Sequence, residues 1–125
     1  MDHEAISGAI ISASMRVHSE LGPGLLESLY ESCLEHELRK IAIPVARQVE
    51  VPVTYDGLRL ESGFRLDLLV CGSVVVEIKA VDRLAPIHTA QMLTYLKLTS
   101  CRVGLLLNFN VVHMRDGIKR IVHQV

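Results

Sequence analysis

Tryptophan is absent from the sequence, and aromatic residues make up only 4% of its 125 residues. The core must therefore be built mainly from Leu, Ile and Val. Too few aromatic side chains are available for the stacking surfaces that general single-strand binders use. No apolar run approaches the roughly 20 residues that are needed to span a membrane, so we expect no membrane partner.

Cysteine is also scarce. Cys33, Cys71 and Cys101 lie far apart, and no Cys-x-x-Cys occurs. This spacing indicates neither a zinc ribbon nor a disulfide framework, and we expect buried, reduced side chains. Together with an acidic N-terminus that has no signal-peptide pattern, reduced cysteines favour a cytoplasmic protein.

The charge balance lacks a basic excess. Lys and Arg number 13 against 14 Asp and Glu, which gives a formal net charge of -1. Nucleic-acid-binding domains are often basic, so any such contact must use a local patch. Arg115, Lys119 and Arg120 form one small cluster, which is either a solvated face or a phosphate contact. A metal-dependent site needs carboxylates, and the bound cation changes the local charge.

The composition and length of the sequence predict one folded domain over residues 1–125. Half of the residues are hydrophobic, and the length suits a single core. Periodicity predicts helices over 4–20, 25–40 and 86–98, strands over 48–55, 58–70, 74–80 and 103–109, and a final strand within 114–125. Asp56-Gly57 indicates a hairpin turn, and Gly63 a kink. The order α-α-β-β-β-α-β-β predicts an α/β or α+β domain with helices packed on one sheet.

The second helix is expected to turn one apolar stripe inward. That stripe comprises Leu26, Leu29, Tyr30, Cys33, Leu34 and Leu38. Helical spacing places these residues on neighbouring positions of one face.

Two charged residues interrupt the apolar strand 74–80. Strand side chains alternate between faces, so Glu77 and Lys79 share one face while Val76 and Ile78 occupy the other. Charges in a core-like strand are costly unless they are paired or bind a metal. The pattern therefore predicts a functional site, with a structural Glu–Lys pair on an exposed face as the alternative.

Asp67 is a third charged residue in apolar surroundings, on the strand before. A two-residue turn at Gly72-Ser73 would pair Asp67 with Ile78 and put Asp67 and Glu77 on opposite faces. Joint metal binding requires a shift of one residue, so we predict a three-residue loop or a bulge near Cys71 to Ser73.

These residue types suit metal-dependent phosphodiester hydrolysis. Asp67 and Glu77 would bind Mg²⁺ or Mn²⁺, a hard cation that prefers oxygen ligands. The metal polarises the phosphate and lowers the pKa of a bound water. Lys79 would assist the attacking water or stabilise charge on the phosphate oxygens.

The chain resembles the PD-(D/E)XK nuclease superfamily and, within it, the GxxExxY family, whose motif matches Gly24-Leu25-Leu26-Glu27-Ser28-Leu29-Tyr30. Further matching positions include His18, Gln48, Val51-Pro52-Val53, Gly63-Phe64-Arg65-Leu66-Asp67, Glu77-Ile78-Lys79-Ala80, His88-Thr89-Ala90-Gln91, Tyr95-Leu96-Lys97, Asn108-Phe109 and Gly117-Ile118-Lys119-Arg120. Leu66 stands where the superfamily motif has Pro. The resemblance implies a restriction-endonuclease-like αβββαβ core, a mixed sheet flanked by helices, with an extra N-terminal helix.

The resemblance also implies site residues. It assigns catalytic roles to Asp67, Glu77 and Lys79, adds Glu27 as a further acidic group, and matches Gln91 and Tyr95 to a Gln-x-x-x-Tyr motif. Among substrate-binding candidates are Tyr95, His88 and Arg65. Three of these additional candidates also have a structural interpretation. Glu27 is favoured in a first helical turn by the helix dipole, Tyr95 suits a core position, and His88 suits a helix cap.

Three functions are consistent with these features. We expect first a metal-dependent nuclease acting on nucleic acid, with DNA favoured over RNA. The second is a catalytically silent module of the same fold that binds nucleic acid or a protein partner. The third is an oligomerisation or toxin–antitoxin-like partner domain, since the apolar C-terminal strands could form a dimer edge.

Overall fold

The computed structural model describes residues 1–124, and every helix and strand expected from the sequence is present within a few residues of its expected bounds. The elements are α1 (His3–Leu21), α2 (Glu27–Lys40), β1 (Val45–Tyr55), β2 (Leu58–Val70), β3 (Val74–Lys79), α3 (Pro86–Thr99), β4 (Val103–Asn108), a short 3-10 helix η1 (Met114–Gly117) and β5 (Ile118–Val122).

The strands form one mixed sheet in the order β1-β2-β3-β4-β5. Neighbours are antiparallel except β3 and β4, which are parallel and are joined through α3. A parallel pair needs such a crossover, because a tight turn cannot bring the chain back to the same end. The arrangement is α+β, as the order of elements predicts, and is consistent with the restriction-endonuclease-like fold that the family resemblance implies.

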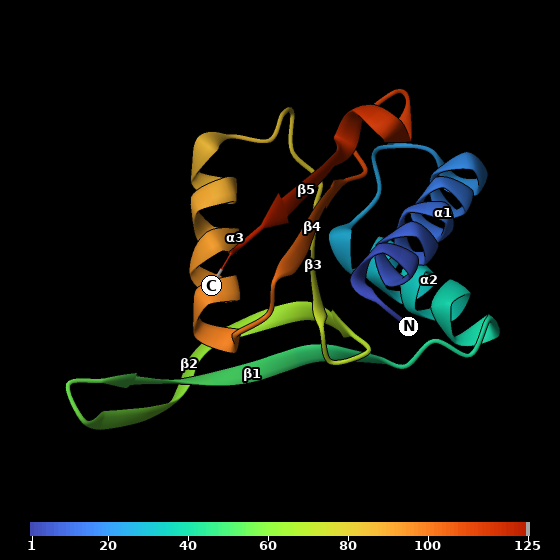
Figure 1. Cartoon of the computed structure of the whole chain (residues 1–125). Helices are drawn as coiled ribbons and strands as arrows, with labels where there is room; N and C mark the ends of the chain where they lie inside the picture. The colour runs from blue at the N-terminus through green and yellow to red at the C-terminus, as the bar shows by residue number, and fades with distance from the viewer. Residues whose placement is uncertain (125) are drawn as a thin grey trace.

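Helices cover both faces of the sheet (Figure 1). Helices α1 and α2 pack on one face, through Ile6, Ile10, Tyr30, Leu34 and Leu38 against β2, β3 and β4. On the other face, Met92 and Leu96 of α3 pack against Leu66, Val75 and Leu106. Strand β4 is buried along its whole length, as its continuous apolar run predicts for a strand covered on both sides.

The inward stripe of α2 is narrower than predicted. Tyr30, Leu34 and Leu38 are fully buried, but Leu26 and Leu29 are 77% and 42% exposed. Leu26 lies outside the helix, which begins at Glu27 and leaves Leu26 in extended conformation. The buried apolar residues Tyr30, Leu34 and Leu38 recur every four positions and form the face of α2 that contacts the core. Leu29 lies at the edge of that face.

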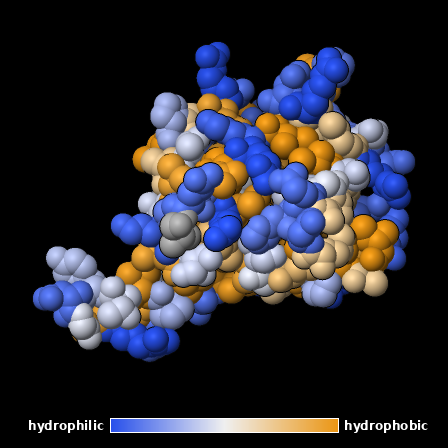
Figure 2. Space-filling view, in the orientation of Figure 1, coloured by the Kyte–Doolittle hydropathy of each residue, from blue (hydrophilic) through white to orange (hydrophobic). Residues whose placement is uncertain are grey.

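The hairpin of β1 and β2 extends beyond the helices, with hydrophilic residues around its tip (Figure 2). Asp56 and Gly57 both have positive φ, 51° and 79°, the conformation of a two-residue hairpin turn of the primed type. The predicted kink is present: the strand register shifts between Val51 and Val53, opposite Gly63. A Cβ atom on Gly63 would overlap the Val53 side chain. None of the described helices is long and apolar enough to cross a membrane.

Candidate active site

The turn between β2 and β3 sets the register of the site. Val70 pairs with Val74 across a three-residue loop, in which Cys71 and Gly72 have positive φ, 54° and 63°. Continuing this register brings Asp67 opposite Glu77. The odd-length loop predicted from the sequence is therefore confirmed, and the two carboxylates lie side by side.

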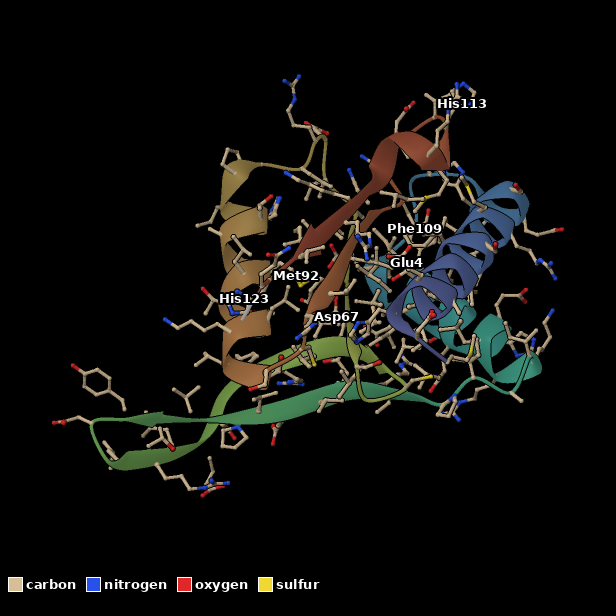
Figure 3. The ribbon with its side chains drawn as sticks, in the orientation of Figure 1. Glu4, Asp67, Met92, Phe109, His113 and His123 are labelled. Atoms are coloured by element: carbon tan, nitrogen blue, oxygen red, sulfur yellow. The ribbon has the colours of Figure 1, made fainter. Side chains whose placement is uncertain are left out.

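Each of the two carboxylates binds the main chain of the other strand. The N–H of Asp67 donates to Glu77 Oε2 at 2.8 Å, and the N–H of Ile78 donates to Asp67 Oδ2 at 2.8 Å. The regular pairs of β2 and β3 end one residue earlier, at Leu68 and Val76. The side chains of Asp67 and Glu77 thus replace the ladder where the regular pairing ends. Asp67 lies in the middle of the molecule, between α3 and the α1–α2 pair (Figure 3).

Burial and mutual repulsion disfavour two ionised carboxylates here. Burial, with the charge of Asp67, raises the pKa of Glu77 to about 8. Burial also raises the pKa of Asp67. Glu77 is only 5% exposed. A positive charge placed between the two groups would reverse both shifts, as expected of a cation site.

Lys79 faces the same side of the sheet as Glu77. Val74, Val76 and Ile78 belong to the core under α1 and α2, so the alternate residues face α3. The ammonium charge of Lys79 lowers the pKa of both Asp67 and Glu77, against the larger effect of burial. Lys79 is half-buried, and its charge acts on both carboxylates.

Glu27 reaches the site from the first turn of α2. Its Oε2 accepts the N–H of Ala80 at 2.9 Å, directly after Lys79. A carboxylate present only for the helix dipole would need no contact with β3. Glu27 also contributes to the raised pKa of Asp67, with a smaller effect than burial and the charge of Glu31.

Tyr30, the last residue of the GxxExxY motif, fixes the segment before Glu27. Its hydroxyl donates to Gly22 O at 2.6 Å and accepts from Leu25 N–H at 3.1 Å. Its ring stacks on Phe109, with centroids 4.4 Å apart. Gly24 adopts a φ of 97°, which glycine tolerates best. The motif thus sets the direction in which the chain enters α2.

Tyr95 lies on α3, on the same side as Glu77. Its ring stacks on Phe64 with centroids 4.5 Å apart. Burial first, and then the charges of Glu77 and Asp67, raise the pKa of its hydroxyl. Tyr95 is therefore both part of the core under α3 and a neighbour of the carboxylates.

The remaining candidates lie less centrally. Gln91 is exposed one turn before Tyr95. His88 accepts the N–H of Ala85 through Nδ1 at 2.9 Å and caps α3, which is the second of its two expected roles. Arg65 is exposed on β2 and pairs across the strands with Glu50.

The basic cluster near the C-terminus is partly engaged in contacts within the chain. Lys119 Nζ donates to Thr89 Oγ1 at 2.9 Å. Arg120 forms an ion pair with Glu4 at 2.7 Å. Arg115 lines a hollow between the end of α1 and η1. These contacts favour the interpretation of a solvated face.

Sequence reasoning assigned no role to two buried polar residues, although Asn108 is among the positions that resemble the family. Glu31, one turn after Glu27, is 5% exposed, and the four-residue spacing on one helix face was the available signal. Asn108 is 1% exposed, accepts Val81 N–H at 3.1 Å and donates to Val81 O at 2.9 Å. It therefore holds the segment that follows Lys79.

The donor set fits a hard divalent cation held partly by water. Asp67 and Glu77 each use one oxygen in the cross-strand bonds, and no hydrogen bond within residues 1–124 occupies Oδ1 or Oε1. Among these residues no group of three or more His, Cys, Asp or Glu could hold a metal ion. Two carboxylates with waters and substrate phosphate completing the shell match the usual coordination of Mg²⁺.

Comparison with known proteins points the same way. Residues 4–121 match the model of the PD-(D/E)XK nuclease superfamily. No curated protein matches the chain. A solved structure titled "Crystal structure of SSO0001" is similar in fold, with a TM-score of 0.57 and 24% sequence identity, over 79% of this chain and 51% of that chain. The chain thus spans about half the length of that protein.

Proposed function

Because the chain belongs to the PD-(D/E)XK nuclease superfamily, we propose that it hydrolyses phosphodiester bonds in nucleic acid in a divalent-metal-dependent reaction. The observation that carries this proposal is the cross-strand exchange between Asp67 and Glu77. It holds two carboxyl groups together, with Glu77 buried and Asp67 half-buried, where ionising both is costly without a cation.

The residues have distinct roles in this proposal. Asp67 and Glu77 bind Mg²⁺ or Mn²⁺ through the oxygens that the main chain leaves free. The bound metal supplies Lewis-acid stabilisation of the phosphate and an acidified water. Lys79 orients the attacking water and offsets charge on the phosphate oxygens. Glu27 adds negative charge beside Ala80, and Tyr95 with Gln91 borders the substrate from α3.

The proposed substrate is nucleic acid, with DNA ahead of RNA. The formal net charge of -1 gives no general attraction for a polyanion. Affinity must therefore come from the metal, from Lys79 and from exposed groups near the site such as Arg65. We also propose membership in the GxxExxY family, since Glu27 and Tyr30 of that motif have separate structural tasks. Glu27 binds the N–H of Ala80, and Tyr30 holds the segment before α2.

The test is a cleavage screen with Mg²⁺ and Mn²⁺ over single-stranded, duplex and branched DNA and RNA. We expect metal-dependent cleavage of at least one substrate. Lys79→Ala and Glu77→Ala should lose it while retaining the circular dichroism spectrum. Lys40→Ala is the matched control, because Lys40 is an exposed lysine at the end of α2. Cleavage at the wild-type rate by either site variant would reject the proposal.

A further inference from the structure

Gln48 has an unusual main-chain conformation for a residue inside a strand. Its φ is 50°, in the left-handed region that residues other than glycine rarely adopt. The pairs Arg47–Leu68 and Val49–Leu66 flank it in the ladder, but Gln48 itself forms no pair with the residue opposite. That residue is Asp67, so the distortion of β1 lies next to the candidate metal ligand.

Strand β2 is irregular at the same level. Residues two apart in a regular strand face the same side of the sheet. Leu66 lies in the core under α3, whereas Leu68 lies in the core under α1 and α2. The chain therefore changes the face it presents across Asp67. This change accompanies the turn of the Asp67 carboxylate toward the main chain of β3.

The side chain of Glu31 ties the distorted part of β1 to α2. Its Oε1 accepts from Gln48 Nε2 at 2.9 Å. Its Oε2 accepts from Arg47 Nε at 2.9 Å and is also 2.9 Å from Arg47 Nη2. Glu31 is 5% exposed, and a buried carboxylate requires such partners. Since both oxygens are engaged, Glu31 acts as an anchor rather than as a cation ligand.

We propose that Glu31 and Gln48 are positioning residues that hold Asp67 in the orientation in which it binds the cation. This inference depends on the proposed function for the metal itself. Helix α2 makes two such contacts, one turn apart: Glu27 accepts the main-chain N–H of Ala80, directly after β3, and Glu31 accepts the side-chain amide of Gln48 on β1. Strand β1 and the end of strand β3, which lie on either side of β2 and Asp67, are thereby both fixed to helix α2.

The test uses two variants and a matched control. Gln48→Gly removes the side-chain amide while glycine adopts the positive φ without strain. Glu31→Gln removes the charge that holds Arg47. The control is Glu35→Gln, because Glu35 also pairs with Arg47, at 3.3 Å, but makes no hydrogen bond with Gln48 in the described chain. Should Glu31→Gln fail to fold, Gln48→Gly carries the test.

Two measurements are made on each folded variant. Mn²⁺ affinity is measured by calorimetry, with Glu77→Gln defining binding at the carboxylates. Amide hydrogen exchange of Asp67 and Ile78, the two donors to the carboxylates, is measured by NMR without metal. We expect Mn²⁺ binding to weaken by about 10–100-fold in Gln48→Gly and Glu31→Gln, the usual effect of losing groups that orient metal ligands. Exchange at both amides should become faster, and Glu35→Gln should match the wild type.

The two hypotheses fail separately. Wild-type protein that binds no Mn²⁺ at the carboxylates rejects the proposed function, and the exchange rates then decide the positioning role alone. Where the wild type does bind, unchanged affinity in folded Gln48→Gly overturns the positioning role and leaves the metal site standing. An equal loss of Mn²⁺ affinity in Glu35→Gln would also overturn the positioning role, because any change in the ion pairs of Arg47 would then have the same effect.

Discussion

Glu27 and Ala80 are 53 positions apart in the chain, yet a hydrogen bond of 2.9 Å joins the Glu27 carboxylate to the Ala80 main-chain N–H. The bond connects the first turn of α2 to the residue that follows Lys79. A helix packed on one face of the sheet thus contributes a charge at the point where β2 and β3 separate. A carboxylate that only stabilised its own helix would not need this contact, so the bond makes Glu27 a candidate for a role at the site.

Replacing Glu27 with Gln should lower activity with little effect on stability. The amide oxygen can still accept the Ala80 N–H, but the negative charge is lost. We expect metal-dependent cleavage to fall at least about 10-fold, while the lost dipole interaction costs only about 0.3–1 kcal/mol. Glu20→Gln, at an exposed position near the end of α1, is the control for both assays. An unchanged cleavage rate in Glu27→Gln would assign Glu27 a purely structural role.

Tyr30→Phe should loosen the segment before α2. The change keeps the ring stacked on Phe109 but removes both hydrogen bonds of the hydroxyl, to Gly22 and Leu25. Gly22 is half-buried and Leu25 is 39% exposed, so water can partly replace the hydroxyl. The loss should cost about 0.5–1.5 kcal/mol, which a thermal melt measures as a lower Tm. Tyr55→Phe, at the exposed hairpin tip, should have no effect. Equal melting of both variants would show that the Tyr30 hydroxyl contributes nothing to the segment.

The metal-free protein should lose stability as the pH rises. The pKa of Glu77 is raised from 4.5 to about 8, by burial first and then by Asp67. The folded state therefore binds a proton that the unfolded state has released, and the associated stability is full below about pH 4.5 and lost through pH 8. Thermal melts in EDTA should show a Tm that falls across this range.

Glu77→Gln provides the control for that pH dependence. The amide of the introduced glutamine does not titrate, so the Tm of this variant should fall less steeply as the pH rises. Mn²⁺ should raise the Tm of the wild type more at pH 8 than at pH 5, because the metal replaces the proton. A wild-type slope equal to that of Glu77→Gln would contradict the raised pKa.

Two glycines should differ in their tolerance of alanine. A Cβ on Gly117 would overlap the main-chain carbonyl of Asn108, whereas one on Gly104 would meet the flexible side chain of Met92. Main chain in a core strand cannot move aside, but a methionine can adopt another rotamer. We expect Gly117→Ala to be destabilised by about 3 kcal/mol and Gly104→Ala by about 1 kcal/mol, the two ends of the usual range for overpacking. Urea denaturation measures both, and the reverse order would contradict this account.

Local pattern in the sequence determined most of the secondary structure and half of the site. Hydrophobic periodicity and turn residues such as Asp56-Gly57 located each helix and strand, because these signals act over a few neighbouring residues. Strand alternation placed Glu77 and Lys79 on one face. The same alternation showed that Asp67 could join them only through an odd-length turn, which the structure contains.

Only the tertiary structure decided which distant groups meet at the site. Glu31 drew no prediction from the sequence, and no local pattern predicts that Arg47 and Gln48 meet it from β1. The exposure of Leu26 and Leu29 likewise depended on where the sheet meets α2. Sequence alone determined the elements and the chemistry available on each strand. Packing determined the rest, because contacts between residues far apart in the chain depend on how the elements cross, and periodicity carries no information about that crossing.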